Sequence, residues 1–87
     1  MDNVRTRVLA AAMDLVNGQR ESDYGTPQES FTRIADMWTA YLGYKVTGRD
    51  VCIMMGLLKA GRLSNGHHQD SAIDAAAYFA LSAEVAE

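Results

Sequence analysis

Two basic and two acidic side chains stand on either side of a short break in the sequence. Lys59 and Arg62 are three residues apart before a Ser-Asn-Gly break. Asp70 and Asp74 are four residues apart after it. Residues at these spacings share one face of a helix. A short connection makes the two helices antiparallel neighbours. We therefore expect Lys59 to lie opposite Asp74. Arg62 is expected opposite Asp70 or Ser71.

This arrangement has two interpretations that the spacing leaves open. In the structural one, the four groups close a helical hairpin as two ion pairs near the surface, each contributing about 0–1 kcal/mol. In the functional one, they line a polar pocket on an otherwise apolar bundle. Asp70 and Asp74 would then bind Mg²⁺, and Lys59 and Arg62 would hold a phosphate.

His67 and His68 occupy the turn of the same hairpin. Adjacent histidines in such a turn are most often exposed or cap a helix end. Zinc would require further ligands, and Asp70 is the only obvious one nearby. Because His68 stands beside the charged groups, we include it among the candidate ligand-binding residues.

Tyr24 is a candidate from a second part of the chain. The segment Asp23-Tyr24-Gly25 is typical of a turn. It also precedes the start of a predicted helix, where free backbone N–H groups attract anions. A tyrosine at that place could stack on a nucleotide base.

Four helices are expected to position these residues. Their predicted ranges are 3–17, 27–42, about 47–63 and 69–86, so the fold class is all-α with an antiparallel hairpin at its centre. Thr26 and Glu29 predict a capping box at the second helix, and Thr47 and Asp50 predict one at the third. In the second helix we expect the stripe that contains Trp38 and Tyr41 to face inward.

The predicted third helix is apolar on nearly all sides. Such a helix is either buried or shared between subunits, and a chain of 87 residues has little else to cover it, so a homo-oligomer is expected. Gly56 and Gly61 within this helix favour close contact with a neighbouring helix, with close approach of a ligand as the alternative.

Composition narrows the class of protein. The 87 residues predict a single domain over 1–87. A net charge of −3 argues against general nucleic-acid binding, although a small anionic ligand remains compatible. Cys52 is the sole cysteine, so it cannot form an internal disulfide, and it is expected to be buried. No signal sequence and no apolar run of about 20 residues is seen, which favours a cytoplasmic protein without a membrane span.

Three ordered strings stand out over roughly residues 10–85. They are Asp23-Tyr24-Gly25-Thr26-Pro27 with Glu29, Phe31, Ile34-Ala35 and Trp38; Met54-Met55 with Leu58-Lys59 and Arg62; and His68 with Asp70-Ser71, Asp74 and Tyr78. In this order they resemble a family of small phage and prophage proteins of unassigned function. Because of this resemblance we expect the protein to act in the cytoplasm of a bacterial host.

That family is in turn similar to nucleotide-modification-associated domains of phages and to all-helical nucleoside triphosphate pyrophosphohydrolases of the MazG type. The resemblance implies an oligomeric bundle that binds Mg²⁺ with two acidic pairs and cleaves between the α and β phosphates. Asp70 and Asp74 lie where the second acidic pair is expected. Where the first pair is expected, the chain carries Met55, Gly56, Lys59 and Arg62.

Three hypotheses about function follow from these residues. The protein is a Mg²⁺-dependent nucleotide pyrophosphohydrolase, a nucleotide-binding protein without catalytic activity, or a small helical module for protein interaction. The charged hairpin has a different role in each, so its geometry decides between them.

Overall fold

The computed structural model describes residues 3–18 and 25–86. These residues form helices and no strand, which confirms the all-α prediction. The helices are α1 (Val4–Val16), α3 (Pro27–Leu42), α4 (Gly48–Leu63) and α5 (Gln69–Glu84). The predicted range of α3 is confirmed. Helix α1 is one residue shorter than expected at each end, and α5 ends at Glu84 rather than at residue 86.

Both predicted capping boxes are present. The Thr26 hydroxyl accepts a hydrogen bond from the N–H of Glu29 (3.2 Å), and the Glu29 carboxylate accepts one from the N–H of Thr26 (2.9 Å). Thr47 and Asp50 make the same two bonds at the start of α4, at 3.0 Å each. These bonds satisfy N–H groups that have no acceptor within the helix, and so they fix where α3 and α4 begin.

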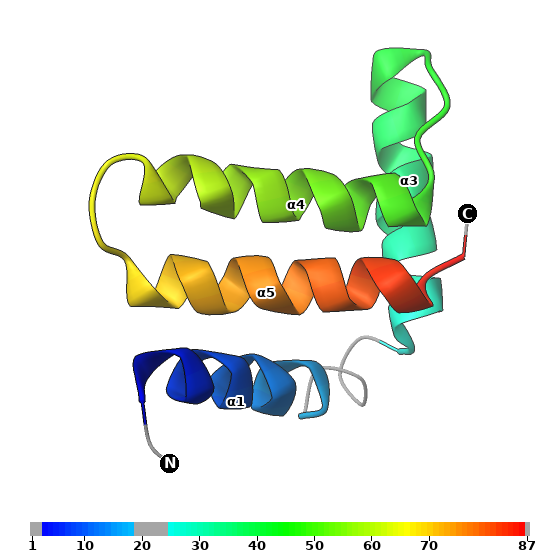
Figure 1. The fold of residues 1–87 in the computed structure, drawn as a ribbon. Helices are drawn as coiled ribbons and strands as arrows, with labels where there is room; N and C mark the ends of the chain where they lie inside the picture. The colour runs from blue at the N-terminus through cyan, green and yellow to red at the C-terminus, as the bar shows by residue number, and fades with distance from the viewer. Residues whose placement is uncertain (1–2, 19–24, 87) are drawn as a thin grey trace.

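Three of the helices lie side by side in one layer (Figure 1). Helices α4 and α5 form the predicted antiparallel hairpin, and α1 lies along the other side of α5. Helix α3 crosses one end of this layer at a steep angle. Its C-terminal end extends past α4, away from α5. The layer holds the charged hairpin, and α3 covers only one end of it.

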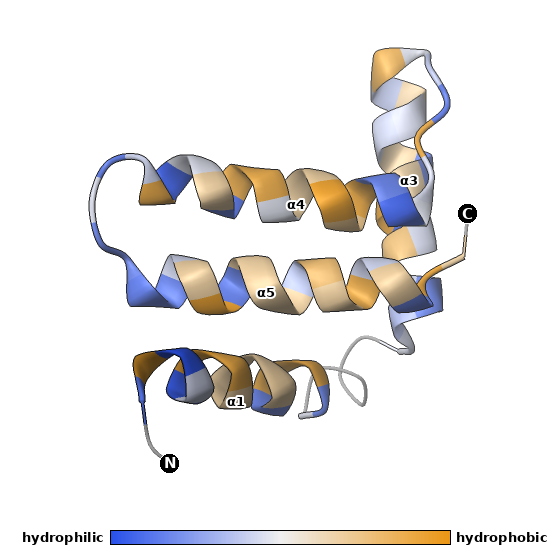
Figure 2. Ribbon diagram, in the orientation of Figure 1, coloured by the Kyte–Doolittle hydropathy of each residue, from blue (hydrophilic) through white to orange (hydrophobic). Residues whose placement is uncertain are grey.

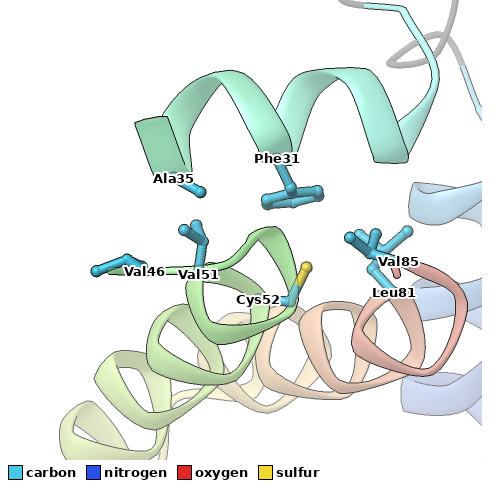
Figure 3. Packing of buried hydrophobic residues seen from close by; sticks show 7 residues of the cluster. All are labelled: Phe31, Ala35, Val46, Val51, Cys52, Leu81 and Val85. Atoms are coloured by element: carbon cyan, nitrogen blue, oxygen red, sulfur yellow. The ribbon is translucent and has the colours of Figure 1, made fainter. Parts of the chain in front are cut away.

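The hydrophobic core lies where α3 crosses the ends of α4 and α5 (Figure 3). Phe31 of α3 is 1% exposed, and its ring meets that of Tyr78 edge to face, with centroids 6.3 Å apart. Cys52 is fully buried in this core, as predicted. The buried cluster comprises Phe31, Ala35, Val46, Val51, Cys52, Leu81 and Val85.

One side chain fixes the connection between α3 and α4. The Thr39 hydroxyl donates a hydrogen bond to the carbonyl of Val46 (3.1 Å) and accepts one from the N–H of the same residue (2.9 Å). Gly43 ends α3 in the left-handed conformation, with φ of 68°. The chain therefore turns sharply after α3 and returns to start α4 beside the core.

Two expectations about packing are corrected. The stripe of α3 was expected to face inward, but Tyr41 is 90% exposed, because the end of α3 that carries it extends beyond α4. Met37 and Leu42 of the same stripe are exposed as well. Trp38, one turn earlier, is partly buried and packs against the core. Gly56 is in close contact with α5, as predicted, whereas Gly61 has no atom within 4 Å of the position its Cβ would take. For Gly61 the prediction of close contact is wrong.

Candidate functional site

The ion pair predicted across the hairpin is present. The Lys59 ammonium lies 3.1 Å from the Asp74 carboxylate. The two side chains are 16% and 33% exposed, so both are largely enclosed between α4 and α5. The spacing argument is therefore confirmed for Lys59 and Asp74.

The two helices pack closely near this pair. A Cβ atom on Gly56 would overlap the ring of Phe79, so this ring occupies the space that a side chain on Gly56 would need. Gly56 is one helical turn from Lys59 and Phe79 is five residues from Asp74, on the opposing helix. Because the helices are antiparallel, this contact puts Lys59 about level with Ala76, two residues from Asp74, and the long lysine side chain reaches that carboxylate.

Arg62 lines a cavity instead of pairing with Asp70. Within the described ranges these two residues form no ion pair. The alternative partner given by the spacing, Ser71, is on the same cavity. The cavity has a volume of about 380 Å³ and is open to solvent at the turn. Its lining consists of Arg62, Asn65, His68 and Ser71. Two candidate residues, Arg62 and His68, are therefore brought together.

The cavity lies at the N-terminus of α5. His68 is the N-cap residue of this helix, and its side chain makes no capping hydrogen bond. The N–H groups of residues 69–71 have no acceptor within the helix, because the first intrahelical bond of α5 is donated by Ala72 to the carbonyl of His68 (3.1 Å). Free N–H groups and the positive end of the helix dipole favour an anion at this place.

The two acidic candidates have different surroundings. Asp70 is exposed in the first turn of α5, and Asp74 is paired with Lys59. Among the described residues, no group of three or more His, Cys, Asp or Glu side chains could hold a metal ion. Tyr24, the remaining candidate, lies outside the described residues.

Sequence reasoning missed part of the site and a larger cavity elsewhere. Asn65 lines the cavity at the turn, but it belongs to a Ser-Asn-Gly string whose only signal was a break in the chain. A second cavity, of about 460 Å³ and mainly apolar, is lined mainly by α1 and α5 and includes Asp14, Tyr78 and the candidate residue Asp74. It depends on α1 packing against α5, and no spacing in the sequence signals that contact.

Comparison with known proteins gives relatives but no assigned activity. Residues 7–86 match the model of a family described as "Domain of unknown function (DUF6378)". The Gene 55 protein of Mycobacterium phage L5 is 47% identical over 73 residues, which cover 82% of this chain and 47% of the relative. The Gene 55 protein of Mycobacterium phage D29 is 38% identical over 72 residues, with 82% and 48% covered. No solved structure matches the chain.

These matches confirm the expected resemblance to phage proteins of unassigned function. The chain spans about half the length of the curated relatives it matches. Among the described residues, no helix is long and apolar enough to cross a membrane.

Proposed function

The chain belongs to the family described as domain of unknown function DUF6378, and we propose that it binds the phosphate groups of a nucleotide at the α4–α5 turn without cleaving them. One observation carries this proposal: Arg62 and His68 line one open cavity at a helix N-terminus that no side chain caps. A guanidinium and free backbone N–H groups are donors suited to phosphate oxygens.

The size of the cavity supports a small ligand. About 380 Å³ lies within the range of about 300–1,000 Å³ typical of small-molecule sites. The Ser71 hydroxyl and the Asn65 amide add neutral polar groups to the lining. Because the family resembles nucleotide-modification-associated domains, we propose that the phosphate groups belong to a nucleotide.

The Lys59–Asp74 pair favours binding over hydrolysis. A Mg²⁺ ion on Asp74 would have to displace an ammonium group 3.1 Å away or share the carboxylate with it. Like charges repel, so a cation in that position weakens Mg²⁺ binding unless other carboxylates compensate. In α4, Lys59 and Arg62 stand where the resemblance would place glutamates.

A Mg²⁺-dependent pyrophosphohydrolase is the second candidate. The observation that favours it is the four-residue spacing of Asp70 and Asp74 on α5, which puts two carboxylates on one side of the helix. In this alternative, the two aspartates hold the metal ion and Arg62 still holds phosphate.

Titration calorimetry with ATP, dATP and inorganic pyrophosphate tests the proposal, first with EDTA and then with Mg²⁺. We expect binding with EDTA present and no release of pyrophosphate from either nucleotide in Mg²⁺. Arg62→Gln should weaken binding about tenfold or more, because it removes charge-assisted hydrogen bonds to phosphate. Arg49→Gln is the matched control, since Arg49 is also exposed on α4 but lies at the opposite end of the helix. It should bind as the wild type does.

Three results would overturn this assignment. No heat of binding with any of the three ligands would remove the nucleotide function. Equal weakening by the two arginine variants would show that binding depends on net charge rather than on this cavity. If the wild type releases pyrophosphate in the presence of Mg²⁺ and Asp74→Asn does not, the hydrolase assignment replaces the binding assignment.

A further inference from the structure

Large apolar side chains stay exposed on the second half of α3 and along α4. On α3, Tyr41 is 90% exposed, and on α4, Leu57 is 59% exposed. Figure 2 shows hydrophobic residues at the free end of α3 and along α4. We call these exposed apolar side chains of α3 and α4 together the outer apolar surface; they are Met37, Tyr41, Leu42, Met54, Leu57 and Leu58.

The part of this surface on α4 faces away from its neighbours. Gly56 contacts Phe79 of α5, and Cys52 lies in the core under α3. Met54 lies two residues from each, and Leu58 lies two residues beyond Gly56. At about 100° per residue, two residues correspond to about 200° around the helix axis. Met54 is therefore on the opposite side of α4 from both contacts, and Leu58 is on the opposite side from Gly56.

The solvent-accessible surface of the chain is larger than that expected for a compact monomer of the same mass. Its accessible surface is 6019 Å², whereas the scaling of surface with mass for folded monomers gives about 5,000 Å² for 9.5 kDa. The difference is about 1,000 Å², close to the roughly 800 Å² that each partner buries in an interface of standard size.

The shape of the chain agrees with this surplus. The radius of gyration is 13.8 Å, against about 12 Å for a compact domain of this length. The overall extents of 45 × 31 × 19 Å describe a flat molecule. Figure 1 shows that the overhanging end of α3 contributes to this shape by standing clear of the layer.

We propose that the outer apolar surface is the interface with a second copy of this chain. A two-fold axis pairs the same patch on both copies. The overhanging end of α3 from each copy then lies against the outer side of α4 in the other. One patch carries both a projecting end and an uncovered helix side, so two copies bury both elements at once. An interface of this apolar composition is typical of homodimers.

Tyr41→Asp is the sharpest test, because a side chain that is 90% exposed contributes little to the fold of one chain. Leu58→Asp tests the surface on α4. The matched control is Leu9→Asp, since Leu9 is 63% exposed on α1 and lies outside the outer apolar surface. Sedimentation equilibrium and light scattering over 1–200 μM measure the mass, and circular dichroism checks that each variant remains helical.

We expect the wild type and Leu9→Asp to form dimers. Tyr41→Asp and Leu58→Asp should raise the dimer dissociation constant about 30-fold or more, as truncation of a central interface residue does. A wild type that is monomeric at 200 μM would overturn the proposal. A Tyr41→Asp variant that dimerises as tightly as the wild type would also overturn it. The same holds if Leu9→Asp is the only one of the three variants that dissociates.

Discussion

Gly56 and Gly61 lie five residues apart on α4 and have different surroundings. The ring of Phe79 occupies the space beside Gly56, whereas the space beside Gly61 is empty. Glycine costs about 1 kcal/mol relative to alanine inside a helix, so either glycine lowers helix stability. The space that the Phe79 ring occupies explains why residue 56 is a glycine. Nothing in the described residues explains the glycine at position 61.

We expect Gly56→Ala and Gly61→Ala to change the free energy of unfolding in opposite directions. Gly56→Ala should destabilise by about 1 kcal/mol, because overpacking against Phe79 exceeds the gain in helix propensity. Gly61→Ala should stabilise by about 0.5–1 kcal/mol. Urea unfolding measures both, in a Tyr41→Asp background that keeps association out of the comparison. A stabilising Gly56→Ala would mean that Phe79 moves aside at little cost.

At the residue scale, spacing predicted the contacts that depend on one hairpin. Lys59 and Asp74 meet because both belong to helices joined by a short turn. Arg62 could not be assigned between its two possible partners, because Asp70 and Ser71 are neighbours and one residue of rotation decides between them. The place of Asn65 in the cavity depends on the path of the turn, which side-chain type alone does not determine.

The capping box at the start of α3 makes this element sensitive to acid. The hydrogen bond from the Thr26 N–H, together with the one from the Thr26 hydroxyl, lowers the pKa of Glu29 from its ordinary value of 4.5. The charge of Arg33 lowers this pKa slightly further, and desolvation opposes the shift. A carboxyl whose pKa is lower in the folded state stabilises the fold above its unfolded pKa, and this contribution is lost as pH falls through the folded pKa.

Glu29→Gln should therefore flatten the acid side of the stability profile. We expect the wild type to lose stability below about pH 4.5 more steeply than Glu29→Gln does, in thermal unfolding at a series of pH values. Thr26→Ala removes the hydroxyl bonds and should also reduce the slope. Glu84→Gln, a substitution of an exposed glutamate at the end of α5, should keep the wild-type slope. Parallel profiles for the wild type and Glu29→Gln would contradict this role of the capping box.

At the scale of elements, helix boundaries were predictable and helix orientation was not. Thr26, Pro27 and Glu29 are local signals, and α3 starts where they indicate. The inward prediction for Tyr41 failed because periodicity identifies an apolar face but not how far the neighbouring helix extends along it. The steep crossing of α3 follows from the Thr39–Val46 bonds and the turn at Gly43, whose combined geometry has no simple pattern in the sequence.

The whole molecule exposes more surface than its mass requires, and this has a thermodynamic consequence. If a second copy covers the outer apolar surface, folding and association are linked, and the melting temperature depends on protein concentration. We expect calorimetry to show a melting temperature that rises between 5 and 200 μM for the wild type. The melting temperature of Tyr41→Asp should stay constant over the same range. A constant melting temperature for both would indicate that the wild type melts as a single chain.

The single thiol lies at the junction of the three helices that build the core. Cys52 is fully buried, with its sulfur pointing toward α3 in Figure 3. A thiolate must reach the reagent to be alkylated, so modification requires α3 to separate from the hairpin or the chain to unfold. The rate of Cys52 alkylation in native buffer therefore reports how often the core opens. No label has to be introduced for this measurement, because the chain carries the thiol itself.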